Sequence, residues 1–330
     1  ATGGNLAATV ASTSTLPPCG GDVAKRQRGG GAAVGGGVSP LIRARILPIL
    51  TVVAVIVAVW YVAVVFMNAP VQRDMDKRAG VTSTTWELVE KTMSQAKPTL
   101  PAPHQIAVNF YENTFLRKVT SKRSLVYHSW VTLASTLAGF GFGTVLGIVI
   151  AVGIVHLKSL ERSLMPWIIA SQTIPILAIA PMVIVVLGAI NITGLIPKAL
   201  ISTYLSFFPV TVGMVKGLRS PEAMHLDLMR TYNASLGQTF WKLRVPASVP
   251  YLFTSMKVAI AASLVGAIVG ELPTGAVAGI GAKLLAGSYY SQTIDMWAAL
   301  FAGSILAAML VAAVGLAWRV VNRAMGGRPI

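Results

Sequence analysis

The stretch DLMRTYNASLGQTFWKLRVP, from Asp227 to Pro246, organises the chain, because it is a polar and basic segment set between two long apolar ones. Asn233 lies near its middle, and Asn is the non-glycine residue that best tolerates the left-handed backbone of a sharp turn. Ser235 and Gln238 have the S-x-x-Q spacing of a capping box, which satisfies free N–H groups at the start of a helix. The stretch therefore predicts a short helix, a sharp turn and a second helix.

The predicted second helix has an apolar part that is exposed to the cytosol. Phe240, Trp241 and Leu243 form this part, and Pro246 marks the predicted end of the helix. Such a helix can bind another protein through its apolar side chains. The alternative is an ordinary basic loop between membrane spans that is helical by chance.

The composition places the chain among membrane proteins. Of its 330 residues, 54% are hydrophobic and only 12% are charged, whereas a soluble domain has about 25% charged residues. The net charge of +16 would suggest a nucleic-acid partner for a soluble chain, but lysine and arginine on cytoplasmic loops explain it more simply. The single Cys19 and four scattered histidines give no reason to expect a metal site.

The N-terminal region predicts a disordered arm followed by a membrane span. Residues 1–42 form the arm, because ten glycines and three prolines in its first 40 positions leave too little apolar surface for a core. Residues 43–67 form the predicted first transmembrane helix, whose apolar run of about 33 Å exceeds the bilayer core of about 30 Å. We see no convincing cleavage site after it, so we expect a retained span and not a signal peptide.

The rest of the chain predicts a large loop, a membrane core and a short tail. Residues 68–124 form an external loop with short amphipathic helices at 86–93 and 106–116. Residues 125–320 form a core of five spans, at 125–155, 164–190, 197–215, 251–270 and 297–320, with an outer loop of several glycines before the last span. Gly139, Gly143 and Gly147 follow the small-xxx-small pattern that lets helices approach closely in lipid. Residues 321–330 form a cytoplasmic tail.

Polar groups beside a broken helix are the candidates for a translocation path. Pro175 and Pro181 interrupt the third predicted span, and a proline frees a backbone carbonyl that lipid cannot satisfy. Polar side chains just before Pro175 either line a path or satisfy the break, and the residues leave both readings open. Glu271, near the outer end of the fifth span, can gate, touch substrate, meet a partner or stabilise structure. The path candidates are Gln172, Thr173, Pro175, Tyr204, Phe208 and Glu271.

The distribution of basic residues tests this topology. Fifteen lie in the predicted inside segments, whereas the two short outside loops hold only Lys198 and Lys283. This bias places both termini and the organising stretch in the cytoplasm. The external loop carries nine basic and five acidic residues, but a loop of that length follows the rule weakly. We therefore expect six spans, with five as the alternative if the first apolar run is peripheral.

The organising stretch resembles the cytoplasmic loop of ABC-importer permeases. That loop is written E-A-A-x3-G-x9-I-x-L-P, and here the same spacing joins Asp227, Asn233, Leu243 and Pro246. Asp replaces Glu, Leu-Met replaces Ala-Ala, Asn replaces Gly and Val replaces Leu. Further segments are similar to permeases of the nitrate, sulfonate and taurine importer branch, over residues 98–326. They are Pro101-Ala102-Pro103, the glycine-rich second span, Thr173-Ile174-Pro175, Phe207-Phe208-Pro209 and Val269-Gly270-Glu271.

The resemblance implies an all-α, type I importer-like permease in the bacterial inner membrane. It implies two permease chains, usually identical, with two ATPase chains that bind ATP and Mg in the cytosol, and a periplasmic binding protein. The loop 222–246 would dock into the ATPase, through Asp227, Asn233, Ala234, Ser235, Gln238, Phe240, Trp241, Leu243 and Pro246. The implied solute is small: nitrate, a sulfonate, taurine or a pyrimidine-like vitamin precursor.

Two other classes of protein fit the sequence less well. A secondary transporter usually has internal repeats and ionisable residues near the membrane midplane, and we find neither. A membrane enzyme needs clustered catalytic groups, and no nucleophile, base and orienting residue form a recognisable set. The chain also has no G-x-x-x-x-G-K-[ST] motif, so we expect it to hold no ATP of its own.

Overall fold

The structure is a computed structural model that describes residues 40–81, 83–273 and 278–326, and the chain divides into two units, 1–52 and 53–330. Apart from the beginning of the first helix, the described helices belong to the second unit. Of the predicted arm, only its last three positions lie within the described residues, where they begin a helix. Every regular element in the described part of the chain is helical, which confirms the predicted fold class.

The helices agree with most of the predicted segments. The two amphipathic helices of the large loop are present, and the second of them continues into a π-helical turn, η1. Within the described residues the bounds are α1 Pro40–Ala79, α2 Thr85–Met93, α3 Pro103–Tyr111, η1 Glu112–Leu116, α4 Leu125–His156, α5 Lys158–Ser171, α6 Ile176–Ala189, α7 Leu195–Leu218, α8 Ala223–Thr231, α9 Leu236–Thr239, η2 Phe240–Arg244, α10 Val245–Gly270, α11 Ile280–Tyr289 and α12 Thr293–Ala324.

The helix α1 extends beyond the predicted first span. Residues 68–79, predicted as the start of the external loop, are helical up to Gly80, which ends the helix with a φ of 67°. Asn68 explains the extension, because it is buried and its side-chain amide donates to the carbonyls of Thr92 and Leu100 at 3.2 and 2.9 Å. The polar end of α1 is therefore held by the loop that follows it.

Within the described ranges, five helices are long and apolar enough to cross a membrane, or up to six if a bent pair counts as one span. The bent pair is α5 and α6, which meet at an angle of 99°. The predicted third span is therefore two helices joined by a break between Gln172 and Pro175 and not one kinked helix, and the chain reaches six spans only if this pair counts as one. The first apolar run, in α1, is among the five helices that are long and apolar enough.

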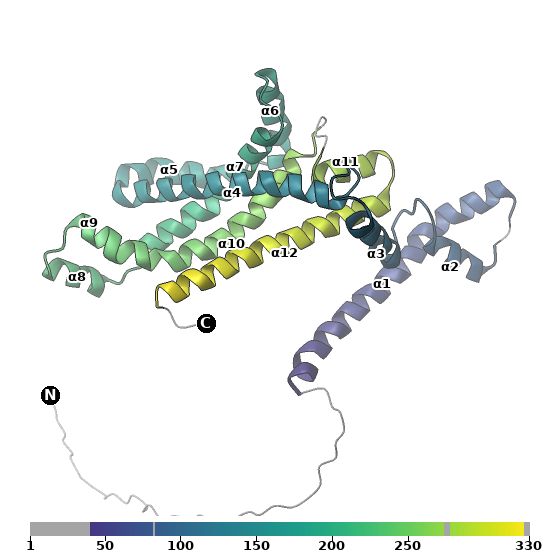
Figure 1. The fold of residues 1–330 in the computed structure, drawn as a ribbon, viewed down its shortest axis with the longest axis horizontal. Helices are drawn as coiled ribbons and strands as arrows, with labels where there is room; N and C mark the ends of the chain where they lie inside the picture. Colours follow the sequence, from purple (N-terminus) through teal and green to yellow (C-terminus); the bar gives the residue numbers. More distant parts are fainter. Residues whose placement is uncertain (1–39, 82, 274–277, 327–330) are drawn as a thin grey trace, which may run out of the picture. The chain divides into compact units, whose positions relative to one another are not determined.

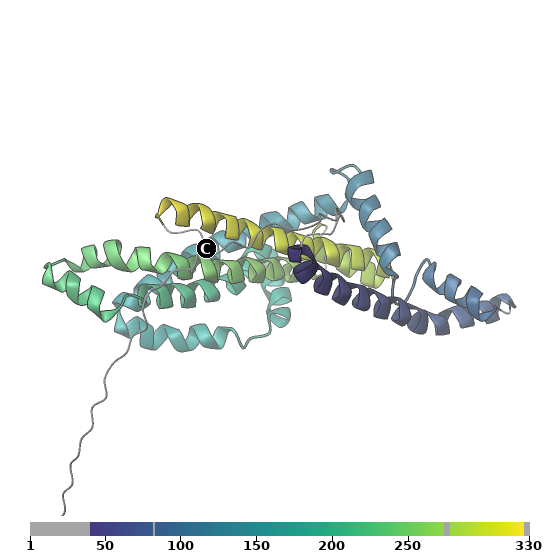
Figure 2. The ribbon, with the colours of Figure 1, turned by 90° about the horizontal axis from the view of Figure 1, so that it is seen from below.

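A bundle of α4, α7 and α10 forms the centre of the second unit, with α12 beside α10 (Figures 1 and 2). The predicted glycine stripe faces α7, and a side chain at Gly139, Gly143 or Gly147 would overlap the atoms of that helix. Hydroxyl groups strengthen the contact, since Ser206 donates to the Gly139 carbonyl at 3.2 Å. In lipid no hydrophobic effect drives helices together, so close packing of small residues and hydrogen bonds from hydroxyl groups hold α4 and α7 together instead.

The outer loop contains a helix that the sequence did not predict. Its glycines suggested an irregular segment, but residues from Ile280 form α11. Gly281 lies against the carbonyl of Ile268, and Gly287 lies against Met296, so the glycines allow α11 to pack closely on its neighbours. At the opposite end of the bundle, α8 and α9 form a helical hairpin (Figure 1).

Candidate functional site

The turn of the hairpin has the predicted left-handed residue. Asn233 has a φ of 49°, and it comes directly after Tyr232, the C-cap of α8, as the C′ position of a Schellman motif. The Asn233 N–H donates to the Arg230 carbonyl at 2.9 Å, and the Ala234 N–H donates to the Met229 carbonyl at 3.0 Å. These bonds satisfy carbonyls that the end of α8 leaves free. The predicted sharp turn is therefore confirmed.

The second helix begins with the predicted capping box. The Ser235 hydroxyl accepts from the Gln238 N–H at 3.3 Å, while the Gln238 side chain accepts from the Ser235 N–H at 2.9 Å. Both residues are exposed. Their hydrogen bonds fix the start of α9 and so set the direction in which it leaves the turn.

Pro246 does not end this helix, contrary to the prediction. The segments α9, η2 and α10 run on as one helix, from Leu236 to Gly270. Pro246 is the second residue of α10 and lies inside this continuous helix, where its ring and its missing N–H have to be accommodated. Just before it, the wider turns of η2 let the Val245 N–H reach back to the Phe240 carbonyl. A π-helical turn of this kind accommodates the proline without breaking the helix.

Large apolar side chains cover the outer surface of the hairpin, defined here as residues 223–244. Leu236 is 91% exposed and Trp241 is 69% exposed, whereas Phe240 is half-buried and meets the His156 ring at 4.8 Å. Leu243 is also half-buried, and Asp227 forms an exposed ion pair with Arg230 at 3.0 Å. The exposed apolar set is Met224, Leu228, Tyr232, Leu236 and Trp241.

The break between α5 and α6 presents polar groups on the surface of the chain. Gln172, Thr173 and Pro175 are all exposed. The Thr173 hydroxyl donates to the Ala170 carbonyl at 2.7 Å, and the Tyr204 hydroxyl donates to the Ser171 carbonyl. These bonds satisfy part of the broken helix, whereas Gln172 is exposed. Both readings that the sequence left open therefore find support at this place.

The remaining path candidates lie on α7 and at the end of α10. Phe208 is half-buried and lines a cleft of about 470 Å³ between α7 and α10, together with Lys216 and Tyr251. Glu271 is fully buried, one residue beyond α10. The structure thus brings Tyr204 to the α5–α6 break but does not bring Glu271 to a surface of this chain.

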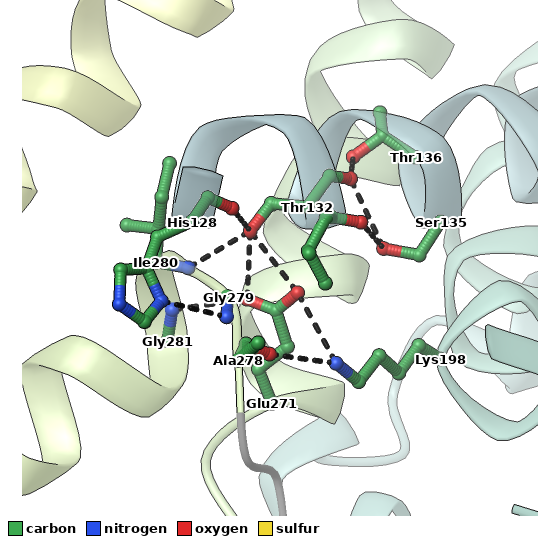
Figure 3. A network of polar contacts seen from close by, with 11 residues as sticks. His128, Thr132, Ser135, Thr136, Lys198, Glu271, Ala278, Gly279, Ile280 and Gly281 are labelled. Carbon is green, nitrogen blue, oxygen red and sulfur yellow. Dashed lines mark hydrogen bonds and ion pairs between the residues drawn. The ribbon is translucent and has the colours of Figure 1, made fainter. Parts of the chain in front are cut away.

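Glu271 joins four helices through a buried network (Figure 3). Its carboxylate forms an ion pair with Lys198 of α7 at 3.5 Å and accepts from the Gly281 N–H of α11 at 3.0 Å. The Thr132 hydroxyl of α4 lies 2.9 and 3.0 Å from the two carboxylate oxygens. Burial raises the pKa of Glu271, while Lys198 and the hydrogen bonds favour the charged form.

The same network holds the end of the outer loop against α4. The Gly279 N–H donates to His128 Nδ1 at 3.0 Å, and His128 Nε2 lies 2.9 Å from the Lys122 carbonyl. Because Nδ1 accepts, the proton of a neutral His128 ring is on Nε2. Gly279 has a φ of 128°, and a side chain there would overlap the Glu271 carboxylate. Only glycine fits at this position.

Sequence reasoning named Glu271 but missed its partners. Lys198, assigned to an outer loop, is a buried residue of α7 whose ammonium donates to the Ala278 carbonyl at 3.0 Å. Two signals could have found the network: a lysine followed by an apolar span, and the pair Gly279 and Gly281 shortly after the carboxylate. Within residues 40–81, 83–273 and 278–326, no three His, Cys, Asp or Glu side chains are arranged to hold a metal ion.

Comparisons with known proteins agree with this architecture. Residues 143–327 match the family described as binding-protein-dependent transport system inner membrane component. A formylaminopyrimidine transport permease protein of Halalkalibacterium halodurans is 32% identical over 187 residues, which cover 56% of this chain and 70% of that protein. A riboflavin transport system permease protein of Chloroflexus aurantiacus is 28% identical over 68% of this chain and 80% of its own length.

A third relative is a nitrate import permease protein of Synechocystis, 26% identical over 55% of this chain and 66% of its own length. It confirms the importer branch that the sequence predicted. The relatives are named as permeases, so the prediction of a permease subunit and not an enzyme is also confirmed. Since the family match covers more than half of its residues, the chain belongs to the inner membrane components of binding-protein-dependent transport systems, the permease subunits of ABC transporters.

Proposed function

We propose that this permease imports a small solute at the expense of ATP that a separate ATPase hydrolyses, and that the hairpin 223–244 couples the two chains. The observation that carries the proposal is the exposed apolar surface of the hairpin, at the end of a helix that continues into the membrane. Exposed apolar surface of this extent, beyond the bundle, is typical of a protein interface. ATP and Mg would then bind to the partner and not to this chain.

The hairpin is built to transmit motion. The helix from Leu236 to Gly270 is about 50 Å long at 1.5 Å per residue. Its first turns belong to the hairpin, and its last residue precedes Glu271, which is bonded to α4, α7 and α11. A displacement of the hairpin by an ATPase would therefore move the buried network at the other end of the bundle.

The α5–α6 break supports a path between two copies of the chain. Irregular backbone is tolerated at membrane depth only where protein or a water-filled cavity covers it. Gln172, Thr173 and Pro175 are exposed in the single chain, so a second permease copy and the path between the copies would cover them. Discontinuous helices also form the substrate sites of other transporters. We therefore propose that Gln172, Thr173, Pro175, Tyr204 and Phe208 border the path, and that the buried Glu271 acts on it through the helices that it joins.

The proposed solute is small and resembles those for which the relatives are named, such as nitrate or a formylaminopyrimidine. A periplasmic binding protein would deliver it to the end of the bundle where Glu271 lies. The hairpin and both termini would face the cytoplasm of a bacterial cell, as the excess of basic residues in the inside segments favours.

Co-purification with the ATPase tests the role of the hairpin. Each variant, Leu236→Asp or Trp241→Asp, places a charge in the exposed apolar surface without removing a buried side chain, because both residues are exposed. We expect each variant to recover less than a tenth of the ATPase that the unchanged chain recovers from detergent-solubilised native membranes. Ser163→Asp is the control, since Ser163 is exposed on α5 and lies outside the hairpin. Full recovery with both hairpin variants would contradict the proposal.

A further inference from the structure

A large cleft lies between α10 and α12, away from the hairpin and from the Glu271 network. Its volume is about 850 Å³, within the range of about 300–1,000 Å³ typical of ligand pockets. One face of α12 forms most of its wall, with residues that recur three and four positions apart. The lining residues are Lys257, Val311, Ala312, Gly315, Leu316, Trp318, Arg319, Asn322 and Arg323.

Three cations line this cleft, and no carboxylate lies near them on its two helices. Lys257 comes from α10, while Arg319 and Arg323 follow one another by a turn on α12. The helix α10 contains no Asp or Glu, and the only acidic residue of α12 is Asp295, about 36 Å along the helix from Arg319. Among the described residues, no ion pair involves any of the three cations.

Lys257 is placed where an unpaired ammonium is costly. It precedes Glu271 by fourteen residues, so its Cα lies about 21 Å from that end of α10, inside the predicted span 251–270 but toward its cytoplasmic end. Its Cε atom lies 3.7 Å from the position that a side-chain carbon on Gly315 would occupy, so the lysine stem crosses α12 at a glycine. The ammonium can then extend toward Arg319 at the end of the helix. Cations at membrane depth usually have a partner.

The apolar part of the cleft and its aromatic rim fit a lipid. Val311, Ala312 and Leu316 line the cleft beside the cations. Trp318 is held against Phe253, with the ring centroids 5.2 Å apart, and tryptophan is enriched where hydrocarbon meets head groups. The site therefore joins a cationic end to an apolar wall between two membrane helices.

We propose that this cleft binds an anionic phospholipid, with its phosphate between Lys257, Arg319 and Arg323 and the upper part of an acyl chain along α12. Basic pockets between transmembrane helices are known to bind the head groups of such lipids. The lipid would supply the negative charge that α10 and α12 lack at this end. The topology that the basic residues favour places the site in the cytoplasmic leaflet.

Native mass spectrometry of the full, delipidated chain in detergent tests the proposal. Phosphatidylglycerol is titrated onto the chain, in parallel with phosphatidylcholine of the same acyl chains. We expect Arg319→Gln with Arg323→Gln to weaken phosphatidylglycerol binding at least about tenfold, since each cation near a membrane surface contributes about a factor of five. The control is Lys158→Gln with Arg162→Gln, which removes the same charge from α5 and should leave the affinity unchanged.

A cleft-filling variant separates a lipid from a free anion. Ala312→Leu keeps all three cations but adds bulk to the apolar wall at an exposed residue one turn from the glycine that Lys257 crosses, so it should weaken phosphatidylglycerol binding while the chain stays as thermally stable as the unchanged protein. Equal affinity for the two lipids, or no loss in the double arginine variant, would overturn the proposal. Displacement of phosphatidylglycerol by millimolar inorganic phosphate would also overturn it and assign the cleft to a soluble anion.

Discussion

At the scale of single residues, Glu271 is a buried charge that holds three other helices to the end of α10. It is fully buried, and it pairs with Lys198 and accepts hydrogen bonds from Thr132 and Gly281. Removal of one partner from a buried pair leaves the other charge uncompensated, at a cost of about 3–5 kcal/mol. We expect Glu271→Ala to lower the free energy of unfolding by about this amount and the melting temperature by about 6–20 °C, measured on the detergent-solubilised chain.

A double-mutant cycle separates this pair from general damage to the fold. Lys198→Met with Glu271→Ala should destabilise the chain by at least about 1 kcal/mol less than the sum of the single variants, because the double variant leaves no unpaired charge. Asp227→Asn is the matched control, since its ion pair is exposed and such pairs contribute at most about 1 kcal/mol. Additive effects of the two core variants would refute a coupled pair.

Substitutions of Asn233 test whether coupling depends on the backbone conformation of the hairpin turn. Its φ of 49° is accessible to glycine without strain, whereas proline fixes φ near −65° and removes the N–H that binds the Arg230 carbonyl. We expect Asn233→Gly to retain uptake in proteoliposomes that also contain the ATPase, and Asn233→Pro to reduce it at least about tenfold while ATP hydrolysis continues. Equal uptake by the two variants would show that the turn geometry does not matter for coupling.

At the scale of elements, local patterns predicted the hairpin well and the breaks poorly. Asn233 and the Ser235–Gln238 box act on their own backbone, so their sequence is sufficient to predict them. The continuation through Pro246 depends on the π-helical turn before it, and α11 depends on close packing of Gly281. Such features are decided by neighbours that a single sequence does not place. The partners of Glu271 were missed for the same reason.

The α5–α6 break gives the element-scale prediction. If Gln172 borders an aqueous path, a cysteine there ionises and reacts with a water-soluble thiol reagent, whereas a cysteine facing lipid does not. We expect Gln172→Cys, in a chain where Ser replaces Cys19, to react at least about tenfold faster than Met309→Cys, an exposed position on α12. The rate should change when ATP is added to the assembled complex. No reaction in either state would exclude Gln172 from the path.

At the scale of the whole molecule, the chain combines a surface for a partner with a rigid connection across the membrane. The hairpin is exposed and apolar, the helix behind it is continuous, and the buried network at its far end ties four helices together. Within the described spans, the charged side chains are near helix ends or in the α10–α12 cleft. This arrangement suits a subunit that is moved by another chain more than one driven by ions crossing its centre.

The source of energy for transport decides between these two mechanisms. In proteoliposomes that contain the chain, its ATPase and its binding protein, we expect uptake to require ATP on the side of the membrane where the hairpin lies. Uptake should persist after ionophores collapse the Na⁺ and H⁺ gradients. A secondary transporter would behave in the opposite way, because its solute is coupled to an ion whose binding needs ionisable groups near the midplane. The chain reconstituted without the ATPase serves as the control and should not accumulate solute. If that chain alone accumulated solute when an ion gradient was applied, the proposal that the hairpin couples transport to ATP hydrolysis would be wrong.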